Sequence, residues 1–251
     1  MLNQEELQAL RFYEGDTEGK DPFWSDPKAY VTLNSLLFSG IDTEKARAAE
    51  KRKLNPEMLV HYEETLGVFQ NLISALRKDR HGNLHVWRVE RLTDYQCFRK
   101  EGMFTSFIST STAGFLKAYE DKFDLVLMDI EIGEDVIAGN LQKLLPYYAK
   151  QEEAEVLLAP YCKVTFEEEP LPAEYKEIRD GHGREAAVFV KTKVSGNYRK
   201  EKKTSFNKED IPGAVSFYES LNEGKKSREE DLASYLRMKK YFRTVVMEKL
   251  V

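Results

Sequence analysis

Three short segments of the sequence hold residue types that can do chemistry. Arg88 lies in the apolar run Val86–Val89, where a guanidinium needs a partner because an unpaired buried charge is costly. Three hydroxyl residues, Ser109, Thr110 and Ser111, follow Phe107 and Ile108 at the end of an expected strand. Glu153 and Glu155 precede Val-Leu-Leu. In an extended chain, residues two apart point to the same face, so these two carboxylates are expected to face one site.

Each of these segments has an ordinary structural reading when it is taken alone. An Arg in a strand is usually an edge residue, and Ser-Thr-Ser is a common turn string. Two further carboxylate pairs, Asp129/Glu131 and Glu167/Glu169, repeat the spacing of Glu153 and Glu155. Spacing alone therefore leaves three candidate carboxylate pairs.

Other kinds of site have little support. His81 and His85 suggest a metal site, but Gly82-Asn83 breaks any helix that would place both imidazoles on one face. No Cys or third His lies nearby in the sequence, so we expect no metal. No Gly-rich phosphate loop and no nucleophile elbow is present. The basic run Tyr198–Lys203 reads as a solvated linker.

The elements that must position these residues are helices first and strands later, which predicts an α+β fold. Asn3 with Glu6, Asp26-Pro27 and Asn55-Pro56 are helix start signals. They predict helices that end near Gly15, Gly40 and Leu76. Apolar runs predict strands at Leu84–Val89, Thr105–Ser109, Leu125–Ile132, Glu155–Leu158, Lys163–Glu167 and Ala186–Thr192.

A domain boundary is expected near Ser195, where a polar linker begins. Residues 1–195 would form the catalytic domain, with N-terminal helices at 1–80 and a β core at 81–195, and residues 196–251 a charged linker and a helical extension. Ser227 with Glu230 predicts a capping box for the terminal helix. The apolar stripe from Leu232 to Leu250 would pack on the rest of the chain or dock a partner, and packing is the commoner case.

Composition excludes several classes of protein. The chain has 251 residues and a net charge of −5, which argues against a dedicated nucleic-acid binder. No stretch approaches about 18 consecutive apolar residues, so no membrane span is expected. Met1-Leu-Asn-Gln-Glu-Glu shows no secretory signal. Cys97 and Cys162 do not suggest a disulfide framework. A cytoplasmic location is the default expectation, and export without a signal peptide stays open.

The ordered set of segments resembles the arginine–serine–glutamate class of mono-ADP-ribosyltransferases, which includes bacterial toxins. The set is Arg88, then Phe107-x-Ser109-Thr110-Ser111, then Glu153-x-Glu155-Val-Leu-Leu. Tyr30-x-x-Leu33-Asn34-x-x-Leu37 is similar to a helix motif of the toxins. The resemblance covers about residues 26–193. It selects Glu153/Glu155, because Asp129/Glu131 lies too close to Ser109 and Glu167/Glu169 runs into Pro170.

The resemblance implies a fold of two small, roughly perpendicular β-sheets with helices beside them and NAD in a cleft. NAD would be a substrate, and no metal would be needed. Arg88 would bind the NAD phosphates, and Ser109 would brace the cleft. Ser111 would position the catalytic Glu155, which would bind the 2′-hydroxyl of the nicotinamide ribose. Thr110, Asn34 and Tyr30 complete the expected cofactor-binding residues.

The Glu-x-Glu form implies a guanidinium acceptor, with Glu153 orienting or deprotonating an arginine side chain. Tyr147 and Tyr148 fall where the family has its substrate-recognition loop, and Tyr119 or Phe123 would cover the nicotinamide. Two positions depart from the family pattern: Val89 replaces a Gly, and Phe38 stands where an Arg often contacts NAD. The resemblance thus assigns roles to four residues outside its motifs: Tyr119, Phe123, Tyr147 and Tyr148.

We therefore expect an NAD-dependent transferase that moves ADP-ribose to an arginine of a protein target and releases nicotinamide. Two alternatives remain open from the residues. One is an NAD glycohydrolase, in which water is the acceptor. The other is a catalytically silent module of the same fold that binds a partner.

Overall fold

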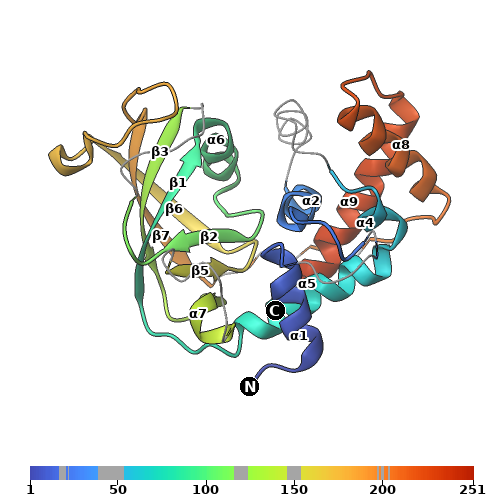
Figure 1. Ribbon diagram of the computed structural model, residues 1–251, viewed down its shortest axis with the longest axis horizontal. Coiled ribbons are helices and arrows are strands. Elements are labelled where there is room, and N and C mark those ends of the chain that lie inside the picture. Colours follow the sequence, from blue (N-terminus) through green and yellow to red (C-terminus); the bar gives the residue numbers. More distant parts are fainter. Residues whose placement is uncertain are drawn as a thin grey trace. The chain divides into compact units, whose positions relative to one another are not determined.

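The computed structural model describes two compact units of the chain (Figure 1). It describes residues 1–16, 21, 23–38, 54–115, 124–145, 154–196, 198, 201–202 and 204–251. One unit comprises residues 1–75 and 199–251, and the other comprises residues 76–198. The first is helical and the second is built on a β-sheet. The α+β class expected from the sequence is confirmed.

The helical unit joins N-terminal and C-terminal helices around one core. Its helices are α1 (Gln4–Tyr13), α2 (Ala29–Leu37), α4 (Glu57–Val60), α5 (Tyr62–Leu76), α8 (Asp210–Asn222) and α9 (Glu229–Leu250). α4 packs on α8, and α2 packs on α9. The Phe69 and Phe242 rings lie 6.0 Å apart between α5 and α9. The Asn222 side chain also holds both backbone groups of Leu54, at 2.8 and 2.7 Å.

Most of the predicted terminal stripe therefore packs inside this unit. Tyr235, Phe242, Val246 and Leu250 are buried, whereas Leu236 is 43% exposed. The division into a catalytic domain at 1–195 and an extension at 196–251 stays a prediction. The structure adds that the extension packs with residues 1–75.

Helix boundaries correct several expectations. The capping box of Asn3 and Glu6 is present and α1 ends before Gly15, as predicted. α2 begins at Ala29 rather than Pro27, because the Asp26 carboxylate holds the Lys28 N–H in a preceding turn. It ends at Leu37, where Phe38 is extended. The long run after Asn55 is two helices, since His61 leaves the helical conformation.

The terminal helix and two other helices also differ from expectation. α9 begins at Glu229 with Arg228 as its N-cap, and no side chain caps it, so the capping box at Ser227 is wrong. Sequence reasoning did not identify α6 (Leu92–Glu101) or the short α7 (Leu141–Leu144). No helix in the described part of the chain is long and apolar enough to cross a membrane.

The second unit is a seven-stranded mixed sheet, in the order β4-β5-β2-β1-β3-β7-β6. Its strands are β1 (Leu84–Arg91), β2 (Ile108–Ser111), β3 (Leu125–Ile132), β4 (Ala138–Asn140), β5 (Glu155–Leu158), β6 (Lys163–Glu169) and β7 (Val188–Ser195). A short 3₁₀ helix (Ala173–Tyr175) precedes β7. β3 and β7 are parallel, and every other pair is antiparallel.

The expectation of two small, roughly perpendicular sheets is met only in part, because the structure joins the two groups of strands in one sheet. β1 and β2 are joined through one residue pair, Trp87 with Ser111. This narrow junction connects β4-β5-β2 to β1-β3-β7-β6 and makes one sheet of both. In Figure 1, β2 and β5 run across the view, whereas β1 and β3 run along its height. The two groups of strands were predicted, but their connection was not.

The two faces of the larger strand group differ in polarity. α6 packs on one face, where the Tyr95 ring lies 5.3 Å from Phe166 and the Tyr95 hydroxyl donates to Glu168. Burial and this acceptor raise the pKa of Tyr95 to about 12. The opposite face carries His85 of β1 and charged side chains of β3, β6 and β7. Because side chains alternate along a strand, each of these strands contributes to both faces.

Candidate active site

The predicted site residues of the sheet unit lie where β1, β2 and β5 adjoin. β2 pairs with β5 so that Ser111 is opposite Glu155, and Ser109 is opposite Leu157. Directly opposed residues of antiparallel strands share a face, so Ser109, Ser111 and Glu155 point to the same side. Glu155 is 4% exposed, and Ser109 and Ser111 are half-buried. The structure thus brings Ser109 and Ser111 close to Glu155, which is more than 40 positions away in the sequence.

Arg88 is attached to this group through the backbone of β2. Its Nη1 donates to the Ser109 carbonyl at 2.5 Å. Its Nε donates to Glu90 at 2.8 Å, and Nη2 lies 2.7 Å from the same carboxylate oxygen. The side chain of Arg88 is 22% exposed and that of Glu90 is 6% exposed. Two partners, the Ser109 carbonyl and the Glu90 carboxylate, therefore fix the orientation of this half-buried guanidinium.

Glu90 is a site residue that sequence reasoning missed. Its signal was available, because Arg88 and Glu90 are two positions apart on a predicted strand and so share a face. The expected strand ended at Val89, one residue too early, and that boundary hid the pair. The buried Glu90 carboxylate is the partner that the Arg88 guanidinium needs in an apolar strand.

Thr110 lies between Ser109 and Ser111, and its contact with a cofactor stays a prediction. It points to the side opposite Ser109 and Ser111, because neighbours in a strand alternate. Its hydroxyl is buried and donates to the Val156 carbonyl at 2.8 Å. This bond ties β2 to β5, so Thr110 supports the pair of strands that carries Ser111 and Glu155.

The chain enters β5 through an unusual residue. Ala154 has a φ of 45°, in the left-handed region that non-glycine residues seldom adopt. The expectation that Glu153 and Glu155 share a face required an extended residue between them, and that premise is wrong. Glu153 itself lies outside the described residues. So do Tyr119, Phe123, Tyr147 and Tyr148.

The remaining predicted residues belong to the helical unit. Asn34 on α2 is buried, and its Nδ2 donates to the Tyr13 hydroxyl at 3.0 Å. Tyr30 is 38% exposed, and its ring lies 6.3 Å from that of Tyr13. A contact of either residue with a cofactor stays a prediction.

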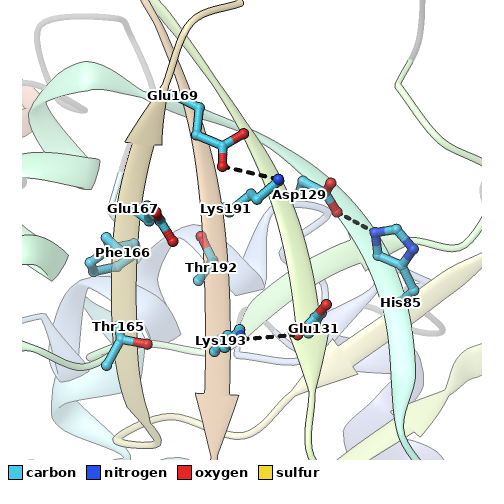
Figure 2. Close-up of a pocket in the computed structure, with 10 residues that line it drawn as sticks. All are labelled: His85, Asp129, Glu131, Thr165, Phe166, Glu167, Glu169, Lys191, Thr192 and Lys193. Atoms are coloured by element: carbon cyan, nitrogen blue, oxygen red, sulfur yellow. Dashed lines mark hydrogen bonds and ion pairs between the residues drawn. The ribbon is translucent and has the colours of Figure 1, made fainter. Parts of the chain in front are cut away.

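The two rejected carboxylate pairs lie in a different place. They line a groove of about 640 Å³ on the open face of β1, β3, β7 and β6 (Figure 2). Figure 2 shows three of their four carboxylates beside cationic or imidazole groups: Asp129 bonds His85, Glu169 lies 2.9 Å from Lys191 and Glu131 lies 3.8 Å from Lys193. Glu169 raises the pKa of Lys191 above its ordinary value. None of the predicted site residues that the structure describes lines this groove.

The two histidines of the suggested metal motif do not meet. His81 contacts the backbone oxygens of Gly82 and Val136 at 2.7 and 2.8 Å, whereas His85 contacts Asp129. The His85 ring also lies 4.4 Å from that of Trp87. Among the residues that the structure describes, no group of three potential metal ligands was found.

No protein-family model matches the sequence, and a search of curated proteins gives no match. Solved structures do match. One is the ADP-ribosylating toxin of a binary enterotoxin of C. perfringens, solved with NADH: identity is 15%, the TM-score is 0.48, and the match covers 77% of this chain. This chain spans only 44% of the length of that protein.

Two further structures cover similar shares of this chain. An ADP-ribosyltransferase toxin from Paenibacillus larvae has 16% identity and a TM-score of 0.42, over 77% of this chain and 87% of its own. The ADP-ribosyltransferase Vis, in complex with agmatine, has 16% identity and a TM-score of 0.42, over 78% of this chain and 76% of its own. All three solved structures are of ADP-ribosylating proteins, and each is similar to this chain over about three quarters of its length.

Proposed function

We propose that this protein is an NAD-dependent mono-ADP-ribosyltransferase that moves ADP-ribose from NAD to an arginine of a protein target. The observation that carries the proposal is the junction of β1, β2 and β5. There Arg88 is bonded to the backbone of Ser109, and Ser111 is paired with Glu155. These are the residues of the ordered motif set, and they come from three strands that are far apart in sequence.

Glu155 would act on the sugar. In the reaction, the bond between the ribose C1′ and the nicotinamide nitrogen breaks, and nicotinamide leaves as a neutral molecule with the electron pair. The ribose then carries positive charge, as in glycoside hydrolysis. A carboxylate that is already fixed beside this charge stabilises it without reorganisation. Glu155 meets the requirement of a fixed position, since it is buried at the first position of a paired strand.

Arg88 would hold the diphosphate of NAD. A guanidinium binds phosphate oxygens through charge-assisted hydrogen bonds, and the two anchors of Arg88 fix its plane before NAD arrives. The Glu90 carboxylate offsets part of its charge. Arg88 would therefore contribute orientation as well as attraction, because its donors keep a set direction.

Glu153 would act on the acceptor. A new bond forms between C1′ and a guanidinium nitrogen of the target, and that nitrogen must lose a proton. An arginine side chain is almost always protonated, so a carboxylate near the attacking nitrogen would hold it and accept the proton. The proposal of arginine as acceptor rests on the Glu-x-Glu sequence.

The test is the release of nicotinamide from NAD, measured with and without agmatine as an arginine analogue. The proposal predicts release that agmatine accelerates, together with formation of ADP-ribosyl-agmatine. Equal release in both cases would identify an NAD glycohydrolase. No release under any condition, from protein that is folded by circular dichroism, would favour a silent binding module and overturn the proposal.

The protein target is found by a second measurement. A cell lysate is incubated with labelled NAD and the protein, and the labelled residue is identified by mass spectrometry. The matched control is the Glu155→Gln protein, which should label nothing. Label on a residue other than arginine would overturn the acceptor assignment and leave NAD as the substrate.

A further inference from the structure

The residue before Glu155 holds an energetically unfavourable backbone. Among the described non-glycine residues, only Ala154 and Tyr161 have a positive φ, of 45° and 64°. Such a conformation persists where surrounding contacts enforce it. At Ala154, the contact comes from the residue that follows the neighbouring strand β2.

Thr112 binds the Ala154 carbonyl with two donors. Its backbone N–H and its hydroxyl both lie 3.1 Å from that oxygen. Thr112 follows Ser111, which is the partner of Glu155 in the ladder. The two bonds therefore extend the pairing of β2 and β5 by one residue beyond Glu155.

The turn after β2 is fixed from its other side as well. The Ser111 hydroxyl oxygen accepts the Ala113 N–H at 3.0 Å. Thr112 is thus held between Ser111 and Ala113 while its side chain reaches across to Ala154. Hydrogen bonds therefore hold both the turn after β2 and the residue that precedes Glu155.

We infer that Thr112 is a positioning residue, whose hydroxyl fixes Ala154 in the left-handed conformation and thereby sets the direction of the Glu155 carboxylate. The inference rests on the proposed function, in which Glu155 stabilises the charged sugar. Thr112 itself touches no reacting atom in this scheme. It acts through the carbonyl of the residue next to Glu155.

The Thr112 hydroxyl should contribute little to the free energy of unfolding. Thr112 is exposed, and its backbone N–H already donates to the same oxygen. Water can replace an exposed hydroxyl, so the net effect on folding is small. Catalysis is more sensitive to position, since a misplacement of about 1 Å can cost roughly 100-fold in rate. The hydroxyl should thus affect turnover much more than it affects unfolding.

The experiment compares Thr112→Val with Thr112→Ser. Val keeps the shape of the side chain and the backbone bond but removes the hydroxyl, whereas Ser restores it. We expect Thr112→Val to lower kcat for nicotinamide release by about 10-fold, with KM for NAD and Tm close to those of the wild type. Thr112→Ser should recover most of kcat. Thr165→Val, the same change on the edge strand β6, is the matched control and should change nothing.

Changes at Ala154 test the same contact from its other end. Gly adopts a positive φ without steric cost, so Ala154→Gly should keep most of the turnover. Val is β-branched and resists this conformation, so Ala154→Val should lower kcat at least as much as Thr112→Val. Wild-type turnover in Thr112→Val, or equal losses in Thr112→Val and Thr112→Ser, would overturn the inference.

Amide hydrogen exchange separates this inference from the proposed function. Peptides that cover residues 154–158 should exchange faster in Thr112→Val than in the wild type, with no change in Thr112→Ser or Thr165→Val. This measurement needs no turnover. If the wild type releases no nicotinamide, the proposed function fails. Equal hydrogen exchange in Thr112→Val and the wild type would independently refute the positioning role of Thr112.

Discussion

Arg88 and Glu90 lie on one face of β1, and the Glu90 carboxylate receives the Arg88 Nε at 2.8 Å and lies 2.7 Å from its Nη2. The same guanidinium donates to the Ser109 carbonyl on β2. The pair therefore joins the two strand groups near their narrow junction at Trp87 and Ser111. Glu90 fixes the residue that we expect to bind the diphosphate.

Removing Glu90 should destabilise the protein more than removing an exposed carboxylate does. Hydrogen bonds to charged groups contribute roughly 1.5–3 kcal/mol, so we expect Glu90→Ala to lower the free energy of unfolding by about 2 kcal/mol. The control is Glu131→Ala, which removes an exposed carboxylate 3.8 Å from Lys193. Urea titration measures both. Equal losses in the two variants would show that Glu90 does not anchor Arg88.

Arg88→Ala tests the phosphate role. A charge-assisted contact of roughly 1.5–3 kcal/mol corresponds to a loss of about one to two decades in NAD affinity. Calorimetric titration of the folded variant with NAD gives this number. Unchanged affinity would exclude the phosphate contact and leave Arg88 as a structural link between β1 and β2.

Glu155→Gln should abolish nicotinamide release and leave the fold intact. Gln keeps the shape of the side chain but lacks the charge that would stabilise the sugar, and loss of such a group costs roughly 100- to 1,000-fold in kcat. Glu131→Gln is the matched control, because Glu131 is a carboxylate on the same sheet that lies in the groove of Figure 2. A folded Glu155→Gln protein with near-native turnover would refute the assignment.

The strands were predictable because their apolar runs are long and β-branched. Leu125–Ile132 and Glu155–Leu158 have the predicted bounds, since both are central or fully buried strands. β4 was missed because Ala138–Asn140 is too short to show a period. α6 was missed because its sequence is rich in polar and charged residues. Its buried residues, among them Tyr95 and Phe98, are too few to form a recognisable apolar stripe.

The pairing of the strands that carry the candidate residues was predictable in part, but the local geometry was less so, and the roles of these residues stay predictions. The register of β2 and β5 brings Ser109, Ser111 and Glu155 to one side, and Arg88 is joined to them by its hydrogen bond to the Ser109 carbonyl. The orientation of Thr110 follows from alternation, which could have been applied. The left-handed Ala154 could not have been foreseen, since Ala has no preference for that conformation. It depends on Thr112, a contact between residues 42 positions apart.

Acid should weaken an ion pair at the N-terminus of α9 and another between α8 and α9. The Arg228 guanidinium holds the pKa of Asp231 below its ordinary value, and Arg237 does the same for Asp210. A carboxylate whose pKa is lower in the folded state adds stability that is complete above its unfolded pKa of about 4. That stability is lost as the pH falls through the folded pKa.

The measurement is the urea midpoint between pH 7 and pH 2.5. We expect little change from these pairs down to about pH 5 and a decline below about pH 4. Asp231→Asn and Asp210→Asn cannot lose a charge, so their midpoints should depend less on acid. If both variants show the full decline of the wild type, other carboxylates account for it.

The last prediction concerns Glu153, and it separates transfer from hydrolysis. Glu155 would act on the sugar, so both activities need it, whereas Glu153 would act on the acceptor alone. Oxocarbenium formation removes no proton from the acceptor, but attack by a guanidinium nitrogen requires proton loss. General-base assistance contributes roughly 10²- to 10⁴-fold. Glu153→Gln should therefore suppress transfer to agmatine strongly and leave NAD hydrolysis much less affected.

The left-handed φ of Ala154 makes this experiment more informative, because Ala154 is not the extended residue that a shared face would require. Glu153 need not share a face with Glu155 for the two to have separate roles. Rates of nicotinamide release and of ADP-ribosyl-agmatine formation are measured side by side for Glu153→Gln and the wild type. Equal loss of both activities would place Glu153 in the NAD site or give it a structural role. Loss of neither would mean that the acceptor is not a guanidinium, because a protonated arginine needs a base for its attack.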